Sequence, residues 1–266
     1  MTRIFSRHKL FAVLAFAGLL AGCSEDTWDI ADLSGPIANS RVRFFNFGVN
    51  SPSVNFYANE TKMTAVVSTT GAEATTGIGY GSVGAGGAYA SIAPGQYALM
   101  GKIAAATDKD LAISTVNTNI EDGKYYSYYQ SGIYNSTAKT VDGFVVEDPI
   151  VAPTDTNTAS VRFVHAISNA NPMTLYAKST TTATETPIGG EVAYKSAGAF
   201  VTIPKGVYDL STRYTGSSTN ALARTGVSFV GGKVYTITAR GDITVAPTTT
   251  GCATTNRTCL DNTANR

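Results

Sequence analysis

The sequence contains two copies of one pattern, and this repeat constrains the fold more than any other feature of the chain. Four segments recur in the same order, with an offset of 119 residues for the first two pairs. The matched segments are 42–46 with 161–165, 54–58 with 173–177, 93–97 with 204–208, and 123–127 with 232–236. Such self-similarity indicates a tandem duplication. We therefore expect two modules, at 40–148 and 159–246, joined by a linker at 149–158 that contains two prolines and several threonines.

Within each module the pattern has a period of two residues, which is the period of a β-strand. Val42, Phe44 and Asn46 alternate with Arg43 and Phe45. Pro-Gly, Asn-Pro and Asp-Gly pairs separate short segments of this kind, and such pairs mark turns. The sequence predicts an all-β chain of two tandem antiparallel β-sandwich domains of the Ig-like or Greek-key type. A barrel is the alternative.

The N-terminal segment 1–22 has the features of a secretory signal peptide. Arg3, Arg7 and Lys9 precede an apolar run at 10–20. A hydrocarbon core needs about 20 apolar residues, so a run of this length is too short to span it. Its length and basic flank are typical of a signal peptide, and no second run of this kind follows. We expect cleavage of this segment and no transmembrane helix.

The run ends in Leu20-Ala21-Gly22-Cys23, which resembles the lipobox of bacterial lipoproteins. The resemblance implies that Cys23 is the mature N-terminus and carries fatty-acyl chains such as palmitate, which anchor it stably in a membrane. Segment 23–39 would then be an acidic tether. Ser24 after the cysteine resembles the pattern for outer-membrane delivery in Gram-negative bacteria. An ordinary signal peptide with a chance cysteine is the alternative.

Two segments of the second copy carry a further resemblance. They are 161–166 (VRFVHA) and 171–176 (NPMTLY), and they resemble the V-R-x-x-H-A … x-V-D-V-Y signature of a bacterial envelope family known as domain of unknown function 4397. Asn46 replaces the signature histidine in the first copy, and Asn55 and Thr174 stand where the signature often has aspartate. The resemblance implies an exported β-sandwich module, often in tandem, with no established activity.

Composition argues against several functions. Charged residues are 15% of the chain and the net charge is +1, so there is no basic footprint for nucleic acid. The two histidines are His8, in the leader, and His165, whereas a histidine zinc site needs two or three. Because the copies carry Asn46 and His165 at one position, we expect both to bind backbone. We predict no catalytic residue, no metal and no cofactor, and therefore not an enzyme.

Two further residue pairs are candidates for specific roles. Cys252 and Cys259 are expected to form a disulfide in an exported chain. They lie in a Thr/Asn-rich tail, 247–266, which reads as poorly ordered, so the bridge would constrain little of the core; an intermolecular crosslink or a metal site is the alternative. Tyr125 and Tyr129 share one face of a strand and are the candidate binding surface. Their alternative role is an aromatic ladder or a contact between the modules.

The sequence thus predicts a lipid-anchored protein of the cell envelope that acts as a non-enzymatic binding or structural module. Its partners would be the membrane, through the lipid, and a glycan, the cell wall or another envelope protein. Two alternatives remain: a hydrolase that uses carboxylates from different strands, such as a glycosidase, and a purely architectural spacer.

Overall fold

The computed structural model describes residues 38–65, 76–246, 252 and 257–265. The predicted signal peptide, Cys23 and its tether lie outside the described residues. Ala38–Arg266 forms one compact unit. In the parts of the chain described here, no helix has the length and apolar character needed to cross a membrane.

The described residues form β-strands, together with one short 3-10 turn at Gly84–Gly87. The strands of the first module are β1 (Arg41–Val49), β2 (Val54–Ala58), β3 (Thr61–Lys62), β4 (Ser82–Val83), β5 (Ala90–Ser91), β6 (Gly95–Ile103), β7 (Ala112–Ile120), β8 (Tyr125–Asn135) and β9 (Thr140–Glu147). Those of the second module are β10 (Thr158–His165), β11 (Met173–Ser179), β12 (Glu185–Val192), β13 (Ser196–Ala197), β14 (Val201–Pro204), β15 (Gly206–Tyr214), β16 (Leu222–Phe229), β17 (Val234–Arg240) and β18 (Cys259–Ala264). The all-β tandem architecture predicted from the sequence is confirmed.

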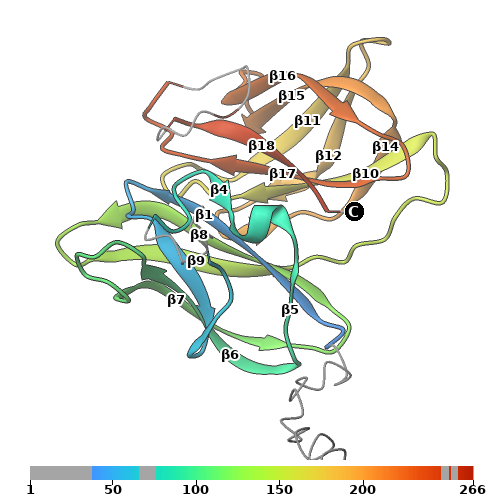
Figure 1. Ribbon diagram of the computed structural model, residues 1–266. Helices are drawn as coiled ribbons and strands as arrows, with labels where there is room; N and C mark the ends of the chain where they lie inside the picture. Colours follow the sequence, from blue (N-terminus) through green and yellow to red (C-terminus); the bar gives the residue numbers. More distant parts are fainter. Residues whose placement is uncertain (1–37, 66–75, 247–251, 253–256, 266) are drawn as a thin grey trace, which may run out of the picture. The chain divides into compact units, whose positions relative to one another are not determined.

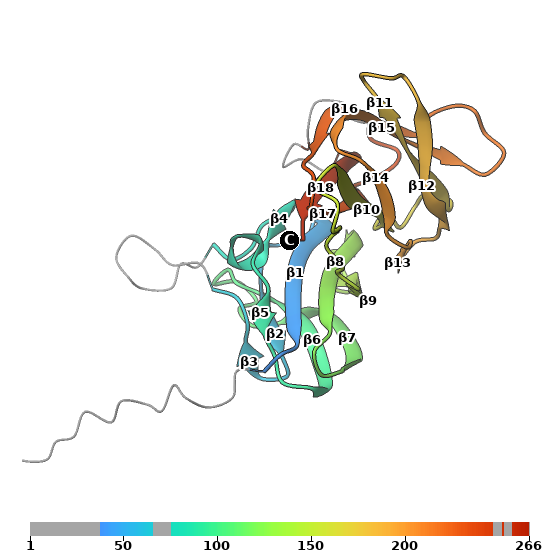
Figure 2. The same ribbon diagram turned by 90° about the vertical axis from the view of Figure 1, so that its right-hand side faces the viewer.

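Each module is a sandwich of two sheets with the same strand order (Figures 1 and 2). One sheet has the order β4-β1-β8-β9 in the first module and β13-β10-β17-β18 in the second, with β5 and β14 as side strands. We call these the inner sheets. The other sheets, which we call the outer sheets, have the orders β3-β2-β6-β7 and β12-β11-β15-β16.

The sequence predicted antiparallel pairing throughout, and this is wrong for one pair of strands in each module. The central strands of the inner sheets, β1 with β8 and β10 with β17, are parallel. In each module the chain builds its outer sheet between these two strands, so the second strand re-enters the inner sheet in the same direction as the first. Parallel pairs are typical of strands covered on both faces, and β1 and β17 are buried almost throughout.

Each module has its own apolar core between its inner and outer sheets. The alternation read from the sequence sends Phe44 and Tyr128 into the first core, where the Phe44 ring stacks on Phe56 at a centroid distance of 5.2 Å. The equivalent residues Phe163 and Ile237 lie in the second core.

A glycine and a tyrosine form the same local structure at the start of β6 and of β15. Gly95 and Gly206 have φ values of +149° and +156°, a region that is open almost only to glycine. A β-carbon at either position would lie 3.7 or 3.6 Å from the ring of Tyr97 or Tyr208. The repeated Gly-x-Tyr pattern therefore sets a strand start with a tyrosine packed beneath it.

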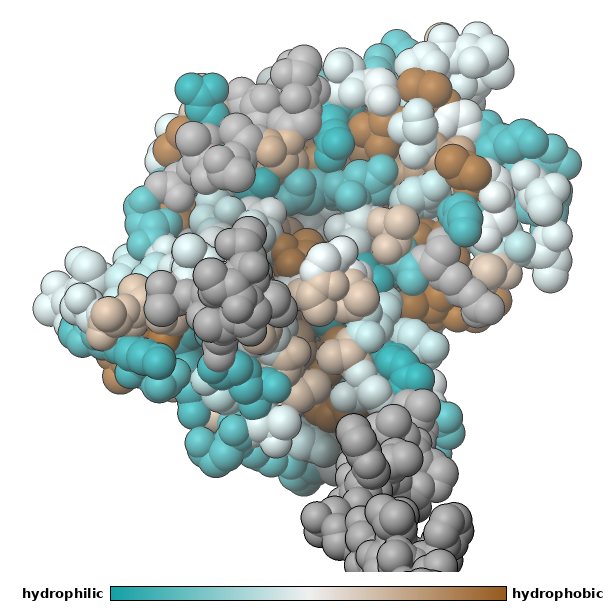
Figure 3. All heavy atoms as spheres, in the orientation of Figure 1, coloured by the Kyte–Doolittle hydropathy of each residue, from teal (hydrophilic) through white to brown (hydrophobic). Residues whose placement is uncertain are grey.

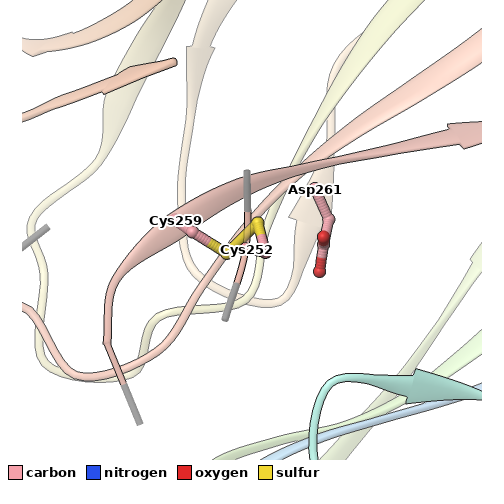
Figure 4. Close-up of side chains that lie close together, drawn as sticks. All are labelled: Cys252, Cys259 and Asp261. Atoms are coloured by element: carbon pink, nitrogen blue, oxygen red, sulfur yellow. A yellow bond between two sulfur atoms is a disulfide. The ribbon is translucent and has the colours of Figure 1, made fainter. Parts of the chain in front are cut away.

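The end of the chain differs from the prediction of a poorly ordered tail after residue 246. Cys259–Ala264 forms strand β18, which pairs antiparallel with β17, and Leu260 lies in the core. Cys252 and Cys259 form a disulfide, shown in Figure 4 with Asp261 further along the same strand. The expectation that this bridge constrains little of the core is wrong, because Cys259 is buried and begins a strand of the inner sheet.

Removal of this disulfide should destabilise the second module. Loss of a bridge that closes a loop of this size increases the entropy of the unfolded chain, and the expected decrease in the free energy of unfolding is about 2–3 kcal/mol. The comparison is chemical denaturation of the Cys252→Ala/Cys259→Ala variant against the parent chain. Reductant should lower the midpoint of the parent alone; equal midpoints without reductant would contradict the role assigned to the bridge.

Candidate functional site

The two inner sheets contact each other through an aromatic cluster. Phe45, Phe47, Tyr129 and Phe144 of the first module and Val164 of the second are buried together. The Tyr129 ring stacks on Phe45 and on Phe144, at centroid distances of 4.5 and 5.0 Å. This cluster forms the apolar part of the interface between the modules.

The predicted binding pair, Tyr125 and Tyr129, is not a shared exposed surface. Tyr129 is 0% exposed, and burial raises the pKa of its hydroxyl to about 12. Tyr125 is 36% exposed and meets the edge of the Tyr89 ring at a centroid distance of 5.2 Å. Strand alternation placed the two tyrosines on one face correctly, but the second module covers that face at Tyr129. The prediction of an exposed site there is wrong.

Two equivalent arginines bridge the modules in opposite directions. Arg162 Nη1 donates to the carbonyl oxygen of Glu147 at 2.8 Å, and Arg43 Nη1 donates to that of Ala264 at 3.3 Å. Arg43 and Arg162 are repeat equivalents, and so are Glu147 and Ala264, which pair with Tyr126 and Tyr235. Each module therefore contacts the other with the same face and through an equivalent arginine, as in an isologous dimer.

The aromatic partners of these arginines repeat in the same way. The Arg43 guanidinium lies 3.9 Å from the ring centroid of Tyr89, and that of Arg162 lies 4.8 Å from the ring centroid of Phe200. A planar guanidinium gains from stacking on an aromatic ring while its N–H groups bind oxygen at the sides. Both arginines are almost fully buried, so these contacts replace the water that a surface arginine would have.

The symmetry is broken at one pair of positions. Asp148 is buried and forms an ion pair with Arg162, and it accepts hydrogen bonds from Ser127 Oγ at 2.7 Å and Tyr89 Oη at 2.6 Å. At the equivalent position the second module has Asn265, whose Nδ2 donates to Thr236 Oγ1 at 2.9 Å. The interface thus contains one buried ion pair where strict symmetry would place two.

Burial and the neighbouring carboxylate of Asp148 raise the pKa of Tyr89, so the phenol stays protonated and donates to that carboxylate. A charge-assisted hydrogen bond of this kind is stronger than a neutral one. Asp148 therefore has three donors around it, which offsets part of the cost of removing a carboxylate from water.

Polar contacts continue to the rim of the interface. The Tyr194 hydroxyl lies 3.0 Å from both Ser131 Oγ and Asp142 Oδ2, and Lys195 pairs with Asp142 at 3.1 Å. Arg240 pairs with Asp261 of β18. The Arg240 guanidinium also lies 5.2 Å from the ring centroid of Phe47. These groups hold the modules against each other.

His165 is buried, and both of its ring nitrogens are in hydrogen bonds. The Ile167 N–H donates to Nδ1 at 3.2 Å, so Nε2 carries the proton and donates to the carbonyl oxygen of Asn171 at 3.1 Å. Burial lowers the pKa of His165, so the neutral ring is favoured.

Asn46 makes the same two contacts in the first module. The Gly48 N–H donates to Asn46 Oδ1 at 3.2 Å, and Asn46 Nδ2 donates to the carbonyl oxygen of Ile78 at 2.8 Å. In each module the side chain therefore accepts from the N–H two residues on and donates to a loop carbonyl. The shared backbone-binding role expected for Asn46 and His165 is confirmed by these bonds.

One group of potential metal ligands lies close together in the described part of the chain. The ligand atoms of Cys252, Cys259 and Asp261 are within 4.8 Å of one another. The two sulfur atoms are bonded to each other, so neither is the thiolate that a metal ion requires. This group is therefore a structural bridge beside a carboxylate.

The buried Arg162–Asp148 pair was not predicted from the sequence. The available signal was the arginine that both copies place between two core residues, at positions 43 and 162. An arginine on the outer face of a strand reads as solvated. That face is buried only because the other module packs against it.

Breaking the ion pair from one side should be costly. The Arg162→Met substitution leaves the Asp148 carboxylate buried without its counter-ion, and the expected loss of unfolding free energy is about 3–5 kcal/mol. Adding Asp148→Asn to Arg162→Met should recover part of this loss. The control is Arg213→Met, which breaks an ion pair at the surface with Glu185 and should cost about 1 kcal/mol or less. Equal losses for Arg162→Met and Arg213→Met in urea denaturation would refute the assignment.

His165 should make the protein less stable in mild acid. Its pKa is lowered in the folded state, so below the ordinary value of 6.5 the unfolded chain binds the proton first and the free energy of unfolding falls. The slope can reach about 1.4 kcal/mol per pH unit. The His165→Asn variant, which copies Asn46 of the first module, should lose this slope between pH 6.5 and 5. Superimposable stability profiles of the two proteins would show that the ring does not titrate in this way.

Comparison with known proteins agrees with the tandem architecture. The family described as Domain of unknown function (DUF4397) matches the chain twice, at residues 40–176 and 159–264. The second match ends at the last residue of β18, which supports the extended boundary of the second module. No curated protein matches the sequence. The two matches together span most of the chain, and the protein therefore belongs to the DUF4397 family.

Proposed function

We propose that this protein is a lipid-anchored cell-envelope protein whose two modules act together as a non-enzymatic binding or structural unit. The observation that carries the proposal is the interface between the inner sheets. It uses the buried polar groups of both modules, including Arg162, Asp148 and Arg43, to hold the modules together. The outer sheets remain as the broad surfaces available to a partner.

The anchor is argued from the sequence. The lipobox-like segment ending at Cys23 follows a basic and then an apolar segment, and the context is that of a lipoprotein leader. Segment 23–39 has 17 residues, which can span at most about 60 Å when extended. A tether of this length would let the modules reach a partner beyond the lipid headgroups.

The outer sheets carry equivalent aromatic and cationic side chains. Lys102 Nζ lies 4.6 Å from the ring centroid of Tyr57 in the first module, and the Arg213 guanidinium lies 4.4 Å from that of Tyr176 in the second. On the face seen in Figure 3, apolar residues occur in separate small groups among polar ones. Such mixed surfaces suit a glycan or a hydrophilic protein partner.

A glycosidase is the second candidate, and the cavities do not favour it. A retaining or inverting site needs two carboxyl groups about 5–10 Å apart across a cleft. The cavities among the described residues include one beside Tyr208, one beside Phe200 and one beside Ile133. Asp142, in the third, is the one carboxylate that lines any of them.

The anchor can be tested in the host. The parent chain should incorporate an alkyne analogue of palmitate and fractionate with membranes, whereas the Cys23→Ala variant should do neither. A Cys252→Ala/Cys259→Ala variant serves as the matched control, since it removes the other two cysteines and should still be labelled. Labelling of the Cys23→Ala variant, or equal membrane recovery of both proteins, would refute lipidation at this residue.

The binding role is tested with the soluble chain from Ser24 onward. Saturable retention on the host's cell-wall or surface polysaccharide fractions would support a binding module. A protein partner is identified by crosslinking on intact cells. Lack of retention and of any specific crosslink would leave the architectural spacer as the function and remove the binding role.

A further inference from the structure

A polar pocket lies at one end of the outer sheet of the second module. It has a volume of about 350 Å³ and lies between the β11–β12 hairpin and the turn that joins β14 to β15. Four threonines of the hairpin, Thr181, Thr182, Thr184 and Thr186, line it together with Lys205 and Tyr208. The volume is within the usual range for a small-molecule site.

The polar groups of this pocket are available to a ligand. The hydroxyls of Thr181, Thr184 and Thr186 and the ammonium of Lys205 form no hydrogen bond or ion pair with the described residues. The hairpin backbone is instead held by Ser179, whose hydroxyl accepts from two N–H groups. The threonine hydroxyls can therefore both donate and accept.

Tyr208 is the aromatic residue that lines this pocket. Its hydroxyl donates to the carbonyl oxygen of Pro204 at 2.7 Å, which fixes the ring. The ring packs in the core of the second module and Tyr208 is 5% exposed, so it contributes only a small part of the pocket wall. Several hydroxyls beside one cation are a combination that suits the hydroxyls and carboxylate of an acidic sugar.

The first module does not repeat this chemistry. Pro94 stands at the position equivalent to Lys205, and the shorter hairpin after β2 keeps one threonine, Thr61, which pairs with Ala58 as Thr186 pairs with Ala177. The Gly-x-Tyr arrangement is common to both modules, but the lysine of the turn and the group of four threonines are confined to the second. Binding should therefore have one site per chain.

We propose that this pocket binds a carboxylated pyranose, as a terminal or internal unit of an acidic polysaccharide. Lys205 would pair with the carboxylate, and the threonine hydroxyls would bind ring hydroxyls. The proposal rests on the proposed binding role for its setting in the envelope, but it concerns this pocket alone.

The test is calorimetric titration of the soluble chain from Ser24 onward with trimers of galacturonic, glucuronic and mannuronic acid and with a neutral galactose trimer. At least one acidic trimer should bind with one site per chain, and the neutral trimer should bind about tenfold more weakly or not at all. Lys205→Met and Thr184→Val should each weaken binding, the former by about tenfold or more. Lys109→Met is the control, because Lys109 is an exposed lysine of the first module.

Absence of binding by all three acidic trimers would overturn the proposal, as would binding that is unchanged in both Lys205→Met and Thr184→Val. Retention of the protein on envelope fractions, measured separately with the same variants, distinguishes the two proposals. Retention that persists in Lys205→Met leaves the binding role intact and places it outside this pocket. Near-native unfolding midpoints of the variants show that a loss of binding is not a loss of fold.

Discussion

The buried ion pair between Arg162 and Asp148 joins the two modules at the place where their inner sheets cover each other, and the rest of the interface is arranged around it. Burying two charges costs several kcal/mol per ion unless good geometry and further hydrogen bonds repay it. Here Ser127 and Tyr89 supply donors to the carboxylate, and Thr236 and the Glu147 carbonyl supply acceptors to the guanidinium. With both faces of each inner sheet interior, the central strands are buried almost throughout and pair in parallel, as in sheets covered on both sides.

The sequence was informative about which residues share a face and uninformative about what lies opposite. Alternation placed Phe44 and Tyr128 in the core and Tyr129 on the other side, and all three positions are right. Whether that other side faces water or protein depends on the second module. The alternation of residues along a strand does not show that another module packs against it. The role of His165 was predictable because the duplication provides Asn46 as an internal comparison, and two side chains of different chemistry at one position point to a shared hydrogen-bonding task.

Strand β18 shows a second limit of sequence reasoning. Its residues, CLDNTA, include one large apolar side chain, Leu260, and have weak strand preference. The strand forms because β17 offers a free edge in the place that β9 occupies on β8, and because the Cys252–Cys259 bridge holds its beginning. An edge equivalent to that of β8 and a disulfide therefore stabilise a strand whose own residues have little preference for one. A Thr/Asn-rich segment can thus contribute to the core when the repeated fold has a strand at that position.

The replacement of Asp148 by Asn265 in the second module has a consequence for self-recognition. The first module alone carries both members of the pair, Arg43 and Asp148, so two first modules facing each other could form two ion pairs, whereas two second modules could form none. The aromatic residues are concentrated on the first module as well. Covalent linkage keeps the second module at high local concentration against that face. The second module thus covers the face of the first on which the charged pair and the aromatic residues lie, and the duplication places within one chain a contact of the kind found between the subunits of an isologous dimer.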